Sequence, residues 1–140
     1  MTKELHYELI AKARTWPRWL LYAKTVWAEA RGETREGRIA VCHVMHRRET
    51  DSLLWNDILD PWQFSCYNYG DPNFSQMMTV GINDRIFQEC IEIAFGVIHG
   101  TIPDPTGGAN HYFNGRLVRP QWANSMTRTA KIGWHEFYRG

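Results

Sequence analysis

The stretch Trp27-Ala-Glu-Ala-Arg-Gly-Glu-Thr-Arg-Glu-Gly37 joins two segments whose apolar residues recur at the spacing of a helix. It places three carboxylates within eight residues, around one glycine. The first segment, residues 18–31, ends where Gly32 can form a left-handed cap, and Thr34 can cap the segment that follows. The stretch therefore predicts two consecutive helices with a short turn between them.

The three acids of this turn are of two kinds. Glu29 falls in the last turn of the first helix, where unpaired carbonyl groups make the potential negative. Trp27 and Ala30 reduce its solvation, so both effects raise its pKa, as a general acid near neutral pH requires. Glu33 and Glu36 fall at the start of the next helix, where capping explains them. An ordinary charged helix end is the alternative for Glu29.

Outward from this turn, the sequence predicts a mainly α chain of the α+β class. Further helices are expected at residues 3–15 and 84–99, the second stopped by Gly100. Residues 51–82 contain scattered Pro and Gly and are expected to be irregular. The C-terminal part, rich in Thr, aromatic residues and turn formers, predicts loops with a small β-hairpin.

The size and composition fit a single domain, residues 1–140, to which helix 3–15 is an appended element. The chain is 44% apolar and 22% charged, which is ordinary for a soluble globular protein and excludes a disordered one. Seven Trp residues are many for this length. Such rings suit a core, and they also suit clefts that hold sugars. We expect a monomer.

The net charge of +1 is unevenly distributed. Residues 1–50 carry ten Lys or Arg against six acids, residues 51–100 one against seven, and residues 101–140 five against two. The two ends can form one basic surface, for which a solvated face is the plain explanation. Because the cations do not cluster in runs, we expect no nucleic-acid partner.

No apolar run approaches the roughly 18 residues of a membrane span, so we expect no stable membrane insertion. The first residues are amphipathic and do not resemble a signal peptide. The expected protein is therefore synthesised in the cytoplasm. Cys42, Cys66 and Cys90 are odd in number and widely spaced, which predicts buried thiols and no disulfides.

Four blocks follow one another along the chain: Glu29-Ala-Arg-Gly-Glu33, Gln63-Phe-Ser65, Asp104-Pro-Thr-Gly-Gly-Ala-Asn-His-Tyr-Phe-Asn114 and Ile132-Gly-Trp-His-Glu-Phe-Tyr138. Together they resemble the cell-wall hydrolase family that includes the spore cortex-lytic enzymes. The resemblance runs from about residue 20 to 138. Four blocks in order are far more specific than any one of them.

The resemblance implies a lysozyme-like fold and an enzyme that cleaves the bond between N-acetylmuramic acid and N-acetylglucosamine in peptidoglycan, without a cofactor or metal. It implies that Glu29 is the catalytic acid. The family's spore enzymes leave a 1,6-anhydromuramic end, so the implied reaction is a lytic transglycosylation, for which one carboxyl suffices. A hydrolytic N-acetylmuramidase stays open. Its second carboxylate would be Asp60, Asp71 or Asp104, each of which also fits as a turn residue beside Pro.

The later blocks supply candidate substrate-binding residues, for each of which loop packing is the plain alternative: Gln63, Ser65, Tyr67, His111, Tyr112 and Asn114. The polar side chains of Gln63 and Ser65 suit binding to the N-acetyl and hydroxyl substituents of a sugar, or can orient Glu29. The tyrosines suit stacking on sugar rings or stabilising a developing positive charge. Gly107 and Gly108 let the backbone turn tightly. His135 is expected to be structural.

Two alternatives of other classes stay open. Cys42, His43 and His46 lie on one helix, and His residues three apart can share zinc, as in an amidase. The sequence has no HExxH and no paired CxxC, and a further ligand would have to be His99, His111 or His135. A wall-binding or virion module without catalysis is the other alternative.

Spore members of the family carry a signal peptide and a separate wall-binding domain, and we expect neither in this protein. That difference favours a phage endolysin, which accumulates in the host cytoplasm and reaches the wall through holin pores. Basic end segments would then help the protein to adhere to an anionic envelope.

Overall fold

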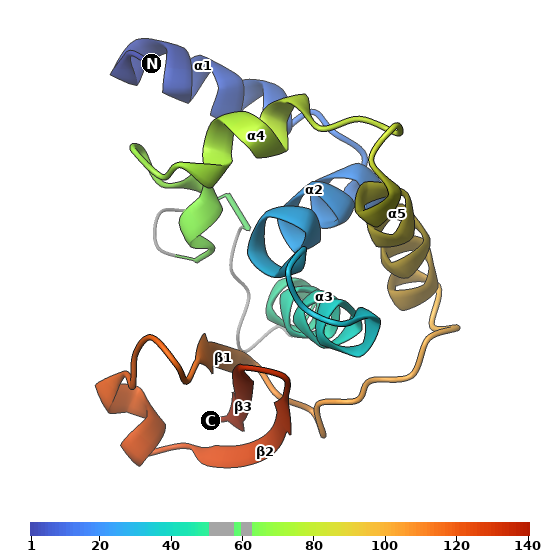
Figure 1. Cartoon of the computed structure of the whole chain (residues 1–140), viewed down its shortest axis with the longest axis vertical. Coiled ribbons are helices and arrows are strands. Elements are labelled where there is room, and N and C mark those ends of the chain that lie inside the picture. Colours follow the sequence, from blue (N-terminus) through green and yellow to red (C-terminus); the bar gives the residue numbers. More distant parts are fainter. Residues whose placement is uncertain (51–57, 60–62) are drawn as a thin grey trace.

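The computed structural model describes residues 1–50, 58–59 and 63–140. Its elements are α1 (Lys3–Ala13), α2 (Arg18–Ala30), α3 (Arg35–Thr50), η1 (Ser65–Tyr67), α4 (Asn73–Thr79), α5 (Arg85–Ile98), β1 (His111–Asn114), η2 (Gln121–Asn124), β2 (Thr127–Ile132) and β3 (His135–Arg139). Helices dominate, and a three-stranded antiparallel sheet lies at one end, beyond α3 (Figure 1). The predicted mainly α chain with a little β structure is confirmed.

Helix α2 lies at the centre of the helical part (Figure 1). Every residue from Leu21 to Ala28 is buried, because α3, α4 and α5 pack around the helix. Even Lys24 is buried, and its ammonium donates to the carbonyl oxygens of Met78 at 3.3 Å and Val80 at 2.7 Å. A helix enclosed in this way fixes the position of its last turn, which carries Glu29.

The turn between α2 and α3 differs from the expected left-handed cap at Gly32. Arg31 caps α2 with a right-handed backbone, φ −61° and ψ −27°, and the φ of Gly32 is not positive. The backbone N–H of Glu33 instead donates to the carbonyl of Ala30 at 3.0 Å, so the turn closes in a right-handed conformation. Thr34 caps α3 as predicted, because its hydroxyl accepts a backbone N–H of the first turn.

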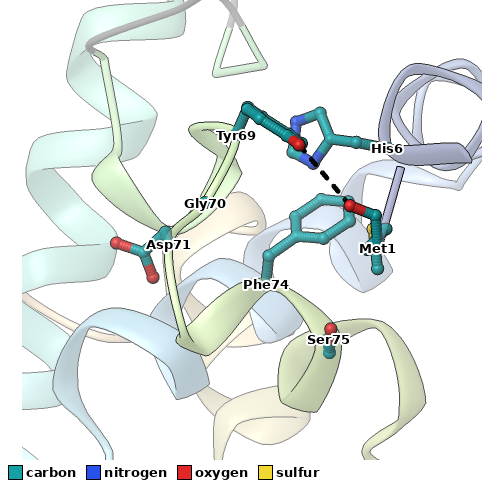
Figure 2. Close-up of a pocket in the computed structure, with 7 residues that line it drawn as sticks. All are labelled: Met1, His6, Tyr69, Gly70, Asp71, Phe74 and Ser75. Atoms are coloured by element: carbon teal, nitrogen blue, oxygen red, sulfur yellow. Dashed lines mark hydrogen bonds between the residues drawn. The ribbon is translucent and has the colours of Figure 1, made fainter. Parts of the chain in front are cut away.

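Helix α1 ends at Ala13, two residues earlier than expected. The hydroxyl of Thr15 donates to a carbonyl three residues back and competes with the helical pattern. The helix packs through His6, whose Nε2 lies 3.0 Å from the carbonyl oxygen of Tyr67. The His6 ring lies 4.2 Å from the ring of Phe74 in α4 (Figure 2). The element expected to be an appendage is thus attached by a buried side chain.

The segment expected to be irregular contains η1 and α4, so that prediction was wrong for residues 65–67 and 73–79. Asp71 initiates α4, since its Oδ1 accepts the N–H of Asn73 at 2.8 Å. Phe74 and Met77 then lie buried on one face of this helix of about two turns. Periodicity does not reveal so short a helix. Pro61 lies outside the described residues.

Helix α5 confirms the prediction to within one residue at each end. Asp84 is its N-cap, and the Oδ1 atom accepts the N–H of Phe87 at 2.9 Å. Gly100 follows the helix with φ +73°, and the N–H of Thr101 donates to the carbonyl of Gly96 at 2.8 Å. This pattern is a left-handed helix end, as the sequence predicted.

The sheet has the strand order β1-β3-β2. Strands β2 and β3 form the expected hairpin, which turns at Gly133 with φ +58°, and β1 adds a third strand that was not expected. Tyr112 pairs with Phe137, and Asn114 pairs with His135. Side chains that are directly opposite share a face. Phe137 packs on α2 and α3, so this face is turned toward the helices.

The three cysteines are buried and free, as predicted. None of the described helices combines the length and the apolar character that a bilayer crossing requires.

Asp84→Ala is expected to lower the free energy of unfolding by about 1 kcal/mol, because it removes the α5 cap. The substitution also removes a 3.3 Å hydrogen bond from Trp27 Nε1. Urea unfolding measures the free energy, and the melting temperature should fall by about 3 °C. Asn83→Ala, at the exposed neighbouring position, is the matched control. Equal stability of the two variants would contradict the capping role.

Candidate active site

The carboxylate of Glu29, in the last turn of α2, is reached by donors from two distant segments. The backbone N–H of Cys66, in η1, donates to Oε1 at 3.3 Å. The hydroxyl of Tyr112, in β1, donates to Oε2 at 3.4 Å. The Cys66 thiol also hydrogen-bonds this carboxylate. Glu29 is only partly buried, so a substrate atom can still approach it.

Burial is the main reason why the pKa of Glu29 is raised above the ordinary value for Glu. The hydrogen bonds from Cys66 lower the pKa, the negative charge of Asp71 raises it, and the hydrogen bond from Tyr112 lowers it. Burial prevails, which confirms the predicted direction. The carboxyl therefore stays protonated at a higher pH than a free Glu does, as a general acid must.

Arg48 brings a positive charge to this site and was not among the predicted site residues. Its Nε donates to the carbonyl of Asn110 at 2.7 Å, and its Nη1 donates to the carbonyl of Gln63 at 3.2 Å. The guanidinium interacts electrostatically with Tyr112 and Glu29. Burial lowers the pKa of Arg48, yet arginine stays charged in proteins. In the sequence, only the position of Arg48 at the end of an apolar helix could have marked it as a site residue.

Tyr67 lies in the core, where a sugar cannot stack on it. The residue is 3% exposed, and its hydroxyl hydrogen-bonds the hydroxyl of Thr25 at 2.6 Å. The bond ties η1 to α2, so it fixes the position of the neighbouring Cys66. The expected role of Tyr67 in stacking is therefore replaced by one in packing.

Tyr112 differs from Tyr67 because its hydroxyl reaches the acid. Burial and the charge of Glu29 raise its pKa well above the ordinary value, so the hydroxyl is a neutral donor. Its ring lies 5.8 Å from Phe137 and 5.0 Å from His135. Tyr112 was among the predicted substrate-binding residues, and the structure brings its hydroxyl to Glu29, but a role in stacking on sugars does not follow from this position.

Gln63 and Ser65 lie just before Cys66, whose backbone N–H donates to the Glu29 carboxylate. Gln63 is partly buried and offers its carbonyl oxygen to Arg48. Ser65 is exposed and belongs to the same single turn, η1, as Cys66. Both residues are therefore close in sequence to Cys66, which donates a hydrogen bond to Glu29. The sequence did not predict that Cys66, the residue directly after this block, makes the contact.

His111 and Asn114 lie at the two ends of β1. The ring of His111 lies 5.0 Å from Trp122, on the face of the sheet opposite to Tyr112. Asn114 shares the face of Tyr112, but its Oδ1 accepts the N–H of Arg116 at 3.0 Å. The structure thus brings Tyr112, but not His111, to the acid.

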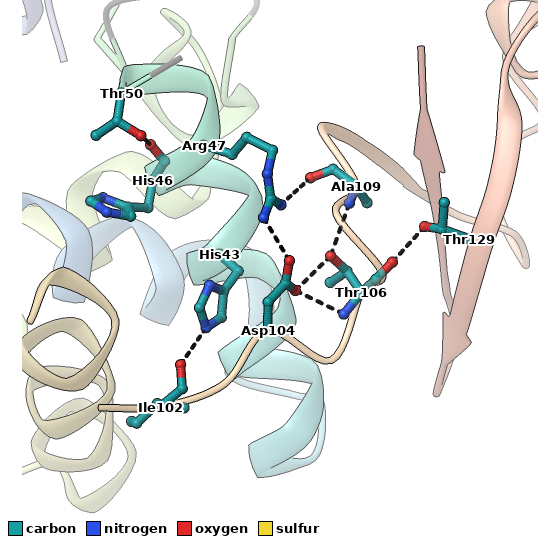
Figure 3. A network of polar contacts seen from close by, with 9 residues as sticks. All are labelled: His43, His46, Arg47, Thr50, Ile102, Asp104, Thr106, Ala109 and Thr129. Atoms are coloured by element: carbon teal, nitrogen blue, oxygen red, sulfur yellow. Dashed lines mark hydrogen bonds and ion pairs between the residues drawn. The ribbon is translucent and has the colours of Figure 1, made fainter. Parts of the chain in front are cut away.

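Asp104 is engaged by its own loop and by α3 (Figure 3). Its Oδ1 accepts the N–H and the hydroxyl of Thr106 at 2.8 and 2.6 Å, and its Oδ2 lies 2.8 Å from Arg47. Burial opposes its ionisation, but these hydrogen bonds hold its pKa below the ordinary value. Gly107 and Gly108 then turn the chain with φ +70° and +86°, as predicted. Asp104 therefore anchors a loop and is not free to serve as a second catalytic carboxylate.

Asp71 is the second-carboxylate candidate whose charge acts on Glu29. It borders a cavity of about 210 Å³ between α1 and α4 (Figure 2). Asp60, the third candidate, lies outside the described residues.

The three side chains considered for zinc have separate neighbours. His43 Nε2 lies 2.8 Å from the carbonyl of Ile102 (Figure 3). His46 Nδ1 lies 3.0 Å from the hydroxyl of Tyr22. Burial raises the pKa of Cys42, which disfavours the thiolate that binds metal. Within residues 1–50, 58–59 and 63–140, no three His, Cys, Asp or Glu side chains gather as a metal site requires.

Glu33 does not act as the expected helix-start charge. Its side chain turns to the sheet, where Oε1 lies 3.2 Å from Nδ1 of His135. Glu36, by contrast, is exposed in the first turn of α3, as expected. The two acids look alike in sequence because the partner of Glu33 comes from a strand about a hundred residues away.

The model of the cell wall hydrolase family matches residues 32–138, a range that begins three residues after Glu29. The spore cortex-lytic enzyme of Oceanobacillus iheyensis is 30% identical over 122 residues, which cover 84% of this chain and 40% of that protein. The spore cortex-lytic enzyme of Bacillus cereus is 29% identical over 121 residues, which cover 84% and 42%. The chain thus spans about two fifths of the length of these relatives.

Two solved structures are similar to this chain. The catalytic domain of the germination-specific lytic transglycosylase SleB from Bacillus anthracis has a TM-score of 0.68 and 25% identity, covering 87% of this chain and 93% of that one. The catalytic domain of the Bacillus cereus SleB protein has a TM-score of 0.65 and 25% identity, covering 87% and 89%. The fold matches that of these catalytic domains.

Glu29→Gln is expected to stabilise the protein at high pH and not at low pH. The folded-state pKa of Glu29 is raised, so its contribution to stability is present in acid and is lost as pH rises through that pKa. A neutral amide avoids this loss. Melting temperatures at about pH 8 should favour the variant, and the gain should vanish near pH 4. A pH-independent difference, or one shared with Glu36→Gln, would contradict the raised pKa.

Proposed function

Because this chain belongs to the cell wall hydrolase family, we propose that residues 1–140 form one catalytic domain, a lytic transglycosylase of peptidoglycan. It cleaves the bond between N-acetylmuramic acid and N-acetylglucosamine, with Glu29 as general acid and then as general base. One observation carries the proposal: a carboxyl with a raised pKa that is held by donors from Cys66 and Tyr112. The lytic activity named for the similar solved domain supports it.

The first step is proton transfer from the Glu29 carboxyl to the glycosidic oxygen. The bond between that oxygen and C1 of the muramic residue then breaks, and N-acetylglucosamine leaves with a hydroxyl group. Positive charge develops on the muramic ring, as in other glycosidases. In the second step, the 6-hydroxyl of the same residue attacks C1 and returns its proton to Glu29. The product is a 1,6-anhydro ring, and the acid is regenerated without water.

The surroundings of Glu29 suit both steps. Burial favours the protonated acid before cleavage. After cleavage, the N–H of Cys66, the hydroxyl of Tyr112 and the charge of Arg48 stabilise the carboxylate. The carboxylate also lies where it can attract the positively charged ring. One carboxyl in such a setting serves as acid and base in turn.

The biological setting that we propose is lysis of a bacterial host by a phage. The protein would be made in the host cytoplasm and would act on the wall once a holin opens the inner membrane. Expression in bacteria with and without a holin tests this setting. Lysis only in the presence of the holin supports it, and lysis without a holin contradicts it.

Mass spectrometry of the fragments released from purified peptidoglycan tests the activity. The wild-type protein should release fragments that end in 1,6-anhydromuramic acid, and Glu29→Gln should release at least about a hundredfold less. Glu36→Gln, an exposed acid on the next helix, should behave as wild type. Release of nothing by folded wild-type protein, or equal release by Glu29→Gln, would refute the proposal.

A hydrolytic N-acetylmuramidase is the second candidate, because the charge of Asp71 acts on Glu29. In that reaction Asp71 would serve across the sugar, and the products would have reducing muramic ends.

Asp71→Asn separates the two candidates. A transglycosylase should retain most of its activity. Because Asp71 raises the pKa of Glu29, the variant should lose activity at a lower pH on the alkaline side of its pH–rate profile. Reducing ends from wild type, together with an inactive Asp71→Asn, would instead establish the hydrolase.

A further inference from the structure

Glu33 and His135 form a buried pair that the proposed reaction does not use. Their side chains are 13% and 8% exposed, and Glu33 Oε1 lies 3.2 Å from His135 Nδ1. In the described part of the chain, neither of these two buried atoms makes a hydrogen bond, so their 3.2 Å approach is a close polar contact. Burial lowers the pKa of His135, and Glu33 opposes this, so the ring is neutral near pH 7. A neutral ring with its proton on Nδ1 would present a polar N–H to the nearby carboxylate oxygen.

Close neighbours hold the Glu33 side of this pair. A Cβ on Gly37 would lie 2.9 Å from Glu33 Cβ, and a Cβ on Gly133 would lie 3.4 Å from Glu33 Oε2. The guanidinium of Arg38 donates to the carbonyl of Glu33 and, at 3.1 Å, to both carboxylate oxygens of Glu89. The pair thus joins the turn after α2 to the turn between β2 and β3.

The His135 side of the pair touches the donor of the catalytic acid. The His135 ring packs edge-on against Tyr112, with centroids 5.0 Å apart, and both side chains project from the helix-facing side of the sheet. The Tyr112 hydroxyl donates to Glu29 at 3.4 Å, which is long for a hydrogen bond. A small displacement of the Tyr112 ring would therefore break the bond.

We propose that Glu33 and His135 are positioning residues that hold the Tyr112 hydroxyl against Glu29. The proposal rests on the proposed function of Glu29. The contacts form a chain: Glu33, in the turn after α2, touches His135 in the sheet, His135 packs on Tyr112, and Tyr112 reaches Glu29 in the last turn of α2. The pair fixes the sheet against that helix, and the sheet in turn sets the distance between the hydroxyl and the acid.

Kinetics on soluble peptidoglycan oligosaccharides test the proposal. Glu33→Ala and His135→Ala should each lower kcat by about tenfold to a hundredfold with KM unchanged, because the donor is misplaced. Tyr112→Phe should have a similar effect, and adding Glu33→Ala to it should lower kcat no further. Glu33→Gln, which keeps a side-chain oxygen at the same reach beside His135 Nδ1, should restore most of the activity. The exposed Glu36→Ala is the matched control.

If Glu33→Ala lowers kcat in the Tyr112→Phe variant by the same factor as in the wild-type protein, the proposal is overturned, since Glu33 then acts by another route. A folded Glu33→Ala variant whose kcat equals that of the control Glu36→Ala would also overturn it.

NMR titration of the Glu29 carboxyl gives a readout independent of activity. Four residues act on this carboxyl: Cys66, Asp71, Arg48 and Tyr112. The Tyr112 hydrogen bond lowers the pKa of Glu29, so losing it in Glu33→Ala, His135→Ala or Tyr112→Phe should raise that pKa. Removing the negative charge of Glu33 would by itself act in the opposite direction.

A pKa of Glu29 that falls or does not change in Glu33→Ala would therefore contradict the positioning role. This titration decides the inference even if the wild-type protein proves inactive on peptidoglycan, a result that would refute the proposed function alone.

Discussion

Partial removal of the Glu29 carboxyl from water is the constraint on which the rest of the site depends. A carboxyl exposed on a helix would be ionised near neutral pH and could not protonate a sugar oxygen. Burial raises its pKa, whereas two hydrogen-bond donors and a nearby guanidinium keep the ionised form accessible. The site balances these opposing effects, as the proposed roles of Glu29 as acid and then as base require.

This balance requires three distant segments to meet at one point. The acid comes from α2, the backbone donor from η1 and the hydroxyl donor from β1. Each segment has its own support: α2 is enclosed by helices, η1 is tied to α2 through Tyr67 and Thr25, and β1 is paired to β3. The loop that leads into β1 is anchored on α3 through Asp104 and Arg47. The sequence blocks shared with the family therefore contain residues that hold Glu29 in place, as well as residues that could contact a substrate.

The sequence predicted the parts of the fold that local rules control. The helical periods around the EARGE turn and in α5, with the caps Thr34 and Asp84, follow from side-chain spacing and capping chemistry. Helix α4 and strand β1 were missed because each is too short for periodicity to show. The sequence singled out Glu29 because its helix position and its motif agreed, and the structure confirms the predicted direction of its pKa.

The partners of Glu29 and its neighbours were less predictable. Cys66 contributes a backbone N–H, which any residue type except proline has, and Arg48 acts through a charge that resembles any helix-end arginine. Tyr67 and Tyr112 look equivalent in sequence, yet only tertiary packing decides which hydroxyl faces the acid. Glu33 was misassigned for the same reason, because its partner comes from the far end of the chain.

A crystal structure of the Glu29→Gln variant with a bound peptidoglycan oligosaccharide tests the central claim most directly. If Glu29 is the general acid, the side-chain amide that replaces its carboxyl will lie within about 2.6–3.2 Å of the oxygen that links N-acetylmuramic acid to N-acetylglucosamine. A sugar chain bound elsewhere, or one whose linking oxygen faces another carboxyl such as that of Asp71, would contradict the account.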